Sequence, residues 1–92
     1  MTSPLPRRSR EQLAQLHHHY REQLPMWVLH ERPNDYPEGF VARLCVSLPK
    51  PVVTRVDIRG ATRAAVEAEL PPGLVFLARH PYDEPQIVGV WL

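Results

Sequence analysis

Two short segments of the chain repeat the pattern Pro-x-Asp-x-Pro and carry residue types that suit binding. The first reads PNDYP at positions 33–37, and the second reads PYDEP at positions 81–85. Carboxylates beside tyrosines suit a cationic or arginine-rich protein surface, because tyrosine offers contact area at low entropic cost and the acids pair with positive charge. The candidate binding residues around the two segments are Asp35, Tyr36, Glu38, His80, Tyr82, Asp83 and Glu84.

The same segments have a second interpretation as plain turns. Asp side chains make Asx hydrogen bonds and Pro fixes φ, so both residue types are common where strands reverse. The acids could also hold a hard metal ion, although neither segment has calcium-binding spacing. Acid–base catalysis by Asp35 and Asp83 would need a walled pocket that a chain of 92 residues rarely builds.

Three consecutive histidines, His17–His19, invite a metal-binding hypothesis. Successive helix positions point about 100° apart, so three neighbours cannot converge on one ion. The i,i+4 pairs His18–Glu22 and His19–Gln23 share a helix face but need further ligands from elsewhere. We therefore predict a solvated helix face, with no metal site and no cofactor.

Cys45 is the single cysteine, so an internal disulfide and a multi-cysteine zinc site are excluded. A nucleophile–base pair with His30 is conceivable. In the strand pairing expected below, however, His30 is not directly opposite Cys45, and the alternation of side chains favours opposite faces of the sheet for the two. We expect Cys45 to be buried beside Trp27. The chain also lacks G-x-S-x-G, P-loop, dinucleotide and H-E-x-x-H motifs, which predicts a protein that is not an enzyme.

Composition points to one small globular domain with a basic N-terminal segment. The net charge is only +1, so no strong overall field attracts nucleic acid or membranes. The chain shows no signal peptide and no apolar run near the ~20 residues that span a bilayer, so we expect a cytoplasmic protein without membrane contact. Basic residues that could contact a polyanion gather near the start of the chain: Arg7, Arg8, Arg10 and Arg21.

The elements that position these residues begin with a helix predicted over residues 10–24. Ser9 and Gln12 form a capping-box pattern at its start, and Pro25 ends it. Its apolar stripe should pack on the sheet or form a homodimer interface with a second copy. That stripe consists of Leu13, Leu16, Tyr20 and Leu24.

The rest of the chain alternates in the way typical of strands. We predict strands over 26–31, 40–48, 52–58, 74–79 and 86–92, with a second helix over 61–70. The fold class is therefore α+β, an antiparallel-dominated sheet in the order α-β-β-β-α-β-β with one short packed helix and an N-terminal amphipathic helix. The predicted organisation is a disordered basic arm over 1–8, the helix segment over 9–25 and a single α+β domain over 26–92.

This order places both Pro-x-Asp-x-Pro loops, and the start of the second helix, at one rim of the sheet. We expect Arg32 opposite Phe40, which would set Trp27 opposite Cys45. In the last hairpin we expect Phe76 opposite Gly89, where an aromatic ring would cover a strand glycine.

Four short motifs follow one another from Met26 onward: Met-Trp-Val at 26–28, Asp-Tyr-Pro at 35–37, Pro-Pro-Gly-Leu at 71–74 and Trp-Leu at 91–92. Together they resemble a group of short uncharacterised proteins from proteobacterial genomes and prophages. The resemblance covers about the last 67 residues of this 92-residue chain and leaves out the N-terminal helix. It brings no established activity, but it implies a mobile-element setting in which small proteins bind and block larger machines. The residues that carry it are Met26, Trp27, Val28, Asp35, Tyr36, Pro37, Pro71, Pro72, Gly73, Leu74, Trp91 and Leu92.

The leading functional hypothesis is a non-enzymatic protein-interaction module, of the kind that acts as a mobile-element or phage inhibitor or adaptor on a larger protein complex. The alternative is a nucleic-acid-associated regulator that uses the basic N-terminal arm. A small metal-binding protein or enzyme is the third hypothesis.

Overall fold

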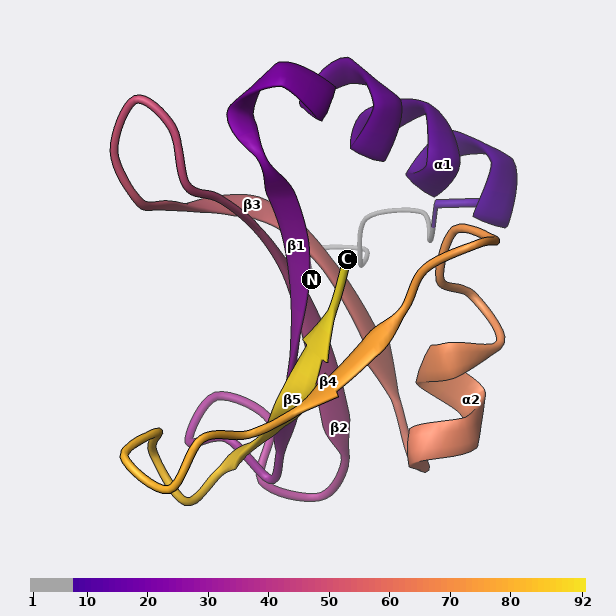
Figure 1. Ribbon diagram of the computed structural model, residues 1–92. Coiled ribbons are helices and arrows are strands. Elements are labelled where there is room, and N and C mark those ends of the chain that lie inside the picture. Colours follow the sequence, from indigo (N-terminus) through magenta and orange to yellow (C-terminus); the bar gives the residue numbers. More distant parts are fainter. Residues whose placement is uncertain (1–7) are drawn as a thin grey trace, which may run out of the picture.

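The computed structural model describes residues 8–92 and shows a small α+β protein, which confirms the predicted fold class. Five antiparallel strands form one sheet in the order β3-β2-β1-β5-β4 (Figure 1). The predicted arm over 1–8 lies, up to residue 7, outside the described residues. The elements are α1 (Arg10–His19), the 3₁₀ turn η1 (Arg21–Gln23), β1 (Pro25–Glu31), β2 (Phe40–Val46), β3 (Val52–Gly60), α2 (Arg63–Glu67), β4 (Phe76–Ala78) and β5 (Ile87–Trp91).

Alternate residues of the central strands build the hydrophobic core on one face of the sheet. Trp27 of β1 lies opposite Leu44 of β2, and both side chains are fully buried. Leu13 from α1 and Val66 from α2 join them, so both helices cover this same face. The buried cluster comprises Leu13, Trp27, Leu29, Ala42, Leu44, Val56, Ile58, Val66 and Leu70.

The first helix begins as predicted and ends earlier. The hydroxyl of Ser9 accepts from the amide of Gln12, whose side chain accepts in return from the Ser9 amide, which completes the capping box. Regular helix stops at His19, and η1 follows it. Leu24 then takes a left-handed φ of 53°, because helical geometry is disfavoured before Pro25. The helix predicted over 10–24 is therefore two shorter elements.

The register of the first hairpin differs from the predicted one by one residue. Glu31, and not Arg32, lies opposite Phe40. Arg32 has a positive φ of 49° and turns the chain out of the strand. The shift moves the partner of Trp27 from Cys45 to Leu44, so the expectation that Cys45 packs beside Trp27 is wrong.

The last hairpin pairs Phe76 with Trp91, and Gly89 lies opposite Ala78. The predicted pairing of Phe76 with Gly89 is therefore wrong, but the aromatic ring still covers the glycine, as predicted. A Cβ at Gly89 would overlap the ring of Phe76, so the ring crosses diagonally over the glycine. Both strands are shorter than predicted at both ends, since β4 lacks Leu74, Val75 and Arg79 and β5 lacks Gln86 and Leu92.

The second helix, Arg63–Glu67, is also shorter than the predicted span of 61–70. Thr62 caps its start, where the Oγ1 atom accepts from the amide of Ala65 at 3.1 Å. The chain leaves helical geometry before Pro71, and Leu70 drops into the core.

The opposite face of the sheet carries no described helix (Figure 1). One row of paired residues crosses all five strands on this open face. It runs from charged side chains on β3 and β2 to apolar side chains on β1, β5 and β4. In order the row reads Asp57, Arg43, Val28, Val90 and Leu77.

Candidate functional site at the loop end of the sheet

Two loops meet at one end of the sheet, which we call the loop end. The first loop (32–39) joins β1 to β2, and the second loop (79–86) joins β4 to β5. They lie side by side because the first residue of β5 pairs with His30 of β1. The amide of Glu31 also donates to the carbonyl of Gln86 at 2.7 Å. Both Pro-x-Asp-x-Pro segments therefore share this end (Figure 1).

The second loop is fixed by hydrogen bonds within itself. The amide of His80 donates to Oδ2 of Asp83 at 2.8 Å, and the amide of Asp83 donates to the carbonyl of His80 at 2.9 Å. The guanidinium of Arg79 donates to the carbonyls of Asp83 and Glu84 at 3.1 and 3.3 Å. The Asp83 carboxylate thus serves the turn, as the turn interpretation of this segment anticipates.

Tyr82 projects from this loop with 93% of its surface exposed. Its amide donates to Nδ1 of His80 at 3.2 Å, and the two rings stack with centroids 5.0 Å apart. A large aromatic side chain is therefore presented to solvent on a loop whose backbone is already ordered. Such a side chain can enter a pocket on another protein with little further loss of conformational entropy.

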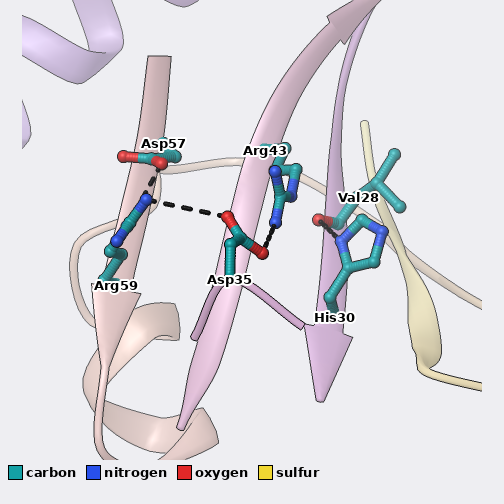
Figure 2. A network of polar contacts seen from close by, with 6 residues as sticks. All are labelled: Val28, His30, Asp35, Arg43, Asp57 and Arg59. Carbon is teal, nitrogen blue, oxygen red and sulfur yellow. Dashed lines mark hydrogen bonds and ion pairs between the residues drawn. The ribbon is translucent and has the colours of Figure 1, made fainter. Parts of the chain in front are cut away.

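The first loop uses its acid differently. Asp35 forms ion pairs with Arg43 of β2 and, at 3.7 Å, with Arg59 of β3, and Figure 2 shows both. Arg59 also reaches Asp57 at 3.3 Å. The hydrogen bond from Arg43 holds the pKa of Asp35 below its ordinary value. The Asp35 charge is therefore balanced within the chain and is less available to a cationic partner.

Tyr36 is tied into the first loop rather than projecting from it. Its amide donates to the carbonyl of Pro33 at 2.9 Å, and the guanidinium of Arg59 lies 5.7 Å from its ring centroid. A Cβ at Gly39 would overlap the Tyr36 ring, so the ring packs directly on this glycine. The sequence assigned Tyr36 and Tyr82 the same role, whereas the structure gives one a packing role and exposes the other.

His30 lies between the two loops on the open face. Burial lowers its pKa, and the nearby positive charge of Arg43 lowers it further. Glu84 from the second loop and Asp35 from the first act in the opposite direction, so the field of both loops reaches this ring. Its Nδ1 lies 3.2 Å from the carbonyl of Val28 (Figure 2). Glu38 and Glu84, the remaining acids of the set, are exposed.

Cys45 and His30 share the open face, which corrects the expected opposite parity. The paired residues Val28 and Arg43 lie between them along the strands, so the two side chains are not neighbours. Burial raises the pKa of the Cys45 thiol, which disfavours the thiolate that a nucleophile requires.

The basic residues near the start of the chain are partly engaged inside it. Nε of Arg10 donates to the carbonyl of Leu70 at 2.8 Å, which ties α1 to the turn that follows α2. Arg21 donates to the carbonyl of His18 at 3.0 Å. Arg8 is exposed, and Arg7 lies outside the described residues.

The apolar stripe of α1 packs on the sheet of the same chain. Leu13 is buried, and Leu16 and Tyr20 pack against the core. Leu24, the last member of the predicted interface, is 56% exposed because it lies beyond the helix. Of the two alternatives that the sequence left open, packing on the sheet is the arrangement observed.

His17 has a contact that sequence reasoning missed. The indole Nε1–H of the buried Trp27 donates to Nδ1 of His17 at 3.0 Å. His17 and Trp27 are ten residues apart and lie in a helix and a strand, so the periodicity of neither element could have indicated their contact. His18 and His19 are exposed, and across residues 8–92 no three His, Cys, Asp or Glu side chains gather as a metal site would require.

An open hollow of about 440 Å³ lies along α1, away from the loop end. Arg8, Gln12, Gln15, Leu16, His19 and Tyr20 line it, and no residue of the two loops does. No helix in the described part of the chain is both long and apolar enough to cross a membrane.

Comparison with known proteins finds no matching family model, no matching curated protein and no matching solved structure.

Proposed function

We propose that this chain is a non-enzymatic protein-interaction module that docks on a larger protein through the second loop, with Tyr82 as its anchor. The observation that carries the proposal is the 93% exposure of an aromatic side chain on a loop fixed by its own hydrogen bonds. Tyrosine is enriched among the residues that dominate binding energy at protein interfaces.

The exposed acids of the two loops at the loop end indicate the chemistry of the partner. Glu84 and Glu38 are exposed acids on the two loops, whereas Asp35 and Asp83 are engaged in contacts within the chain. A matching surface would offer a pocket for the phenol ring and positive charge around its rim. Blocking of a larger host complex, which the resemblance to prophage proteins implies, is the finer form of this proposal.

The test starts with affinity capture from a host lysate, followed by measurement of the affinity of the purified partner for wild-type chain and for Tyr82→Ala. We expect Tyr82→Ala to weaken binding by about thirtyfold or more, the effect of losing about 2 kcal/mol at an interface anchor. Leu24→Ala is a matched control, because Leu24 is also exposed but lies at the opposite end of β1.

Two results would contradict the proposal. One is a partner whose affinity for Tyr82→Ala equals its affinity for wild type. The other is recovery of nucleic acid alone, released by salt, which would favour the basic N-terminal segment instead.

A further inference from the structure

The sheet has two edges, and β3 forms a protected one. Its pairing with β2 shifts register between Arg43 and Cys45, which places a bulge in the edge strand. The hydroxyl of Thr54 fills the bulge by donating to the carbonyl of Leu44 at 2.7 Å and accepting from the amide of Val56 at 3.1 Å. A bulge in an edge strand, and charged side chains such as those on β3, discourage pairing with a further strand.

Among residues 8–92, no strand pairs with the outer side of the other edge strand, β4, which is short but has no bulge. The segment 75–78 contains neither proline nor charge, and its pairing with β5 runs without a register shift. Val75 and Leu92 exchange backbone hydrogen bonds at 2.8 and 3.0 Å, and the amide of Arg79 donates into β5 at 3.2 Å. Because strand residues alternate in direction, Phe76 and Ala78 point their N–H and C=O groups away from β5, toward the open edge.

Exposed apolar side chains accompany this edge. Val75 is 61%, Leu77 is 52% and Leu92 is 48% exposed, and all three gather at the β4–β5 side of the sheet. A strand added beside β4 would satisfy the outward backbone groups and cover part of this apolar surface in one step.

We infer that β4 is a self-association site, at which β4 of a second copy pairs antiparallel across a two-fold axis through Leu77. In this register Phe76 exchanges backbone hydrogen bonds with the partner's Ala78, and Leu77 packs on the partner's Leu77. The two sheets then join into one continuous sheet of ten strands, since each copy contributes five.

The charge pattern of the segment agrees with this register. Val75 would lie opposite the partner's Arg79, so no two like charges face each other along the paired strands. The guanidinium of Arg79 is also turned toward its own loop, where it donates to the carbonyls of Asp83 and Glu84. Because β4 is only three residues long, the contact is small, and we expect a monomer–dimer equilibrium that depends on concentration.

Charge substitution on the two-fold axis tests the pairing by sedimentation equilibrium. Wild-type chain should approach twice the monomer mass with rising concentration, whereas Leu77→Glu and Leu77→Lys should each remain monomeric. An equimolar mixture of these two variants should dimerise again, because opposite charges then meet at the axis. Val53→Glu is the matched control, since Val53 is 62% exposed on the protected edge strand and should leave dimerisation unchanged.

Amide hydrogen exchange gives a second readout that does not depend on the Leu77 side chain. The amides of Phe76 and Ala78 should be protected in concentrated wild-type chain and exchange rapidly in Leu77→Glu. Ala78→Pro, which removes one outward donor and leaves the β5 side intact, should also abolish the dimer.

A wild-type chain that stays monomeric at the highest concentration measured would overturn the inference. Protection of Phe76 and Ala78 only in complex with another protein would also overturn it, in favour of a strand supplied by that protein. The inference is separable from the proposed function, because Leu77→Glu should keep Tyr82-dependent binding and Tyr82→Ala should keep the dimer.

Discussion

The indole N–H of Trp27 donates to Nδ1 of His17 over 3.0 Å and so links the central strand to the helix that covers it. Trp27 is fully buried, and a buried N–H without an acceptor would cost about 1–3 kcal/mol. Burial also holds the pKa of His17 below its ordinary value and so favours the neutral ring, and the hydrogen bond from Trp27 selects the tautomer whose Nδ1 carries no proton. A residue in a run of three histidines therefore serves the core.

This contact predicts a loss of stability in mild acid. The unfolded chain takes up a proton on His17 near the ordinary pKa of about 6.5, whereas the folded chain does so only at lower pH. The stabilisation is therefore complete above about pH 6.5 and falls as the pH drops toward the folded pKa. Urea unfolding from about pH 8 to about pH 5 should show this decline.

The variant His17→Asn should flatten this decline, because its side-chain carbonyl can accept from Trp27 but does not titrate. Some decline of the free energy of unfolding with falling pH should persist in this variant, since the pKa of His30 is lowered as well. His18→Asn is the control, because His18 is exposed on the same helix and should follow wild type. Equal slopes for wild type and His17→Asn would contradict the prediction.

The two loop tyrosines should separate in their effect on stability. Tyr36→Ala removes a ring that packs on Gly39 and Arg59, and it should lower the free energy of unfolding by about 1 kcal/mol or more. Tyr82→Ala removes an exposed ring and should change it by less than about 0.5 kcal/mol. Thermal and urea unfolding of both variants measure the difference, and equal losses would show that the second loop depends on Tyr82 for its structure.

Gly89→Ala should destabilise the last hairpin by about 1–3 kcal/mol, because the added methyl group would overlap the ring of Phe76. The carbonyl of Leu77 also lies close to the position of this methyl group. Phe76→Leu should therefore recover part of the loss, so that the double variant is more stable than the sum of the single changes predicts. A Gly89→Ala chain that unfolds like wild type would show that the ring of Phe76 does not pack directly on this glycine.

Element types and their order followed from local patterns, because period-two alternation and proline breaks act within one segment. The capping box of Ser9 and Gln12 is local in the same sense, and it was predicted atom for atom. The registers predicted for the two hairpins were wrong, since register depends on how the chain leaves a strand and enters the loop. The strand end at Glu31 was predicted, but the positive φ of Arg32 takes that residue out of the pairing with Phe40, and no residue type at that position signalled it.

The candidate site was predicted at the level of topology and not at the level of side chains. Counting strand directions places both loops at one end of the sheet, as the pairing of His30 with the start of β5 requires. The sequence could not distinguish Tyr36 from Tyr82, because the difference arises from Arg59, which reaches the first loop from a strand on the sheet edge. Sequence distance hides contacts of this kind.

Cys45 should react slowly in the folded chain. It lies half-buried on the open face opposite Met26, and burial raises the pKa of its thiol, so little thiolate is available to attack an alkylating reagent. Labelling with iodoacetamide near pH 8 should be about tenfold slower or more in native chain than in urea-unfolded chain. Met26→Ala should uncover the sulfur and speed native labelling, whereas Leu24→Ala, at an exposed position outside the strand, should not. Native labelling as fast as that of the unfolded chain would mean that the open face leaves this thiol accessible.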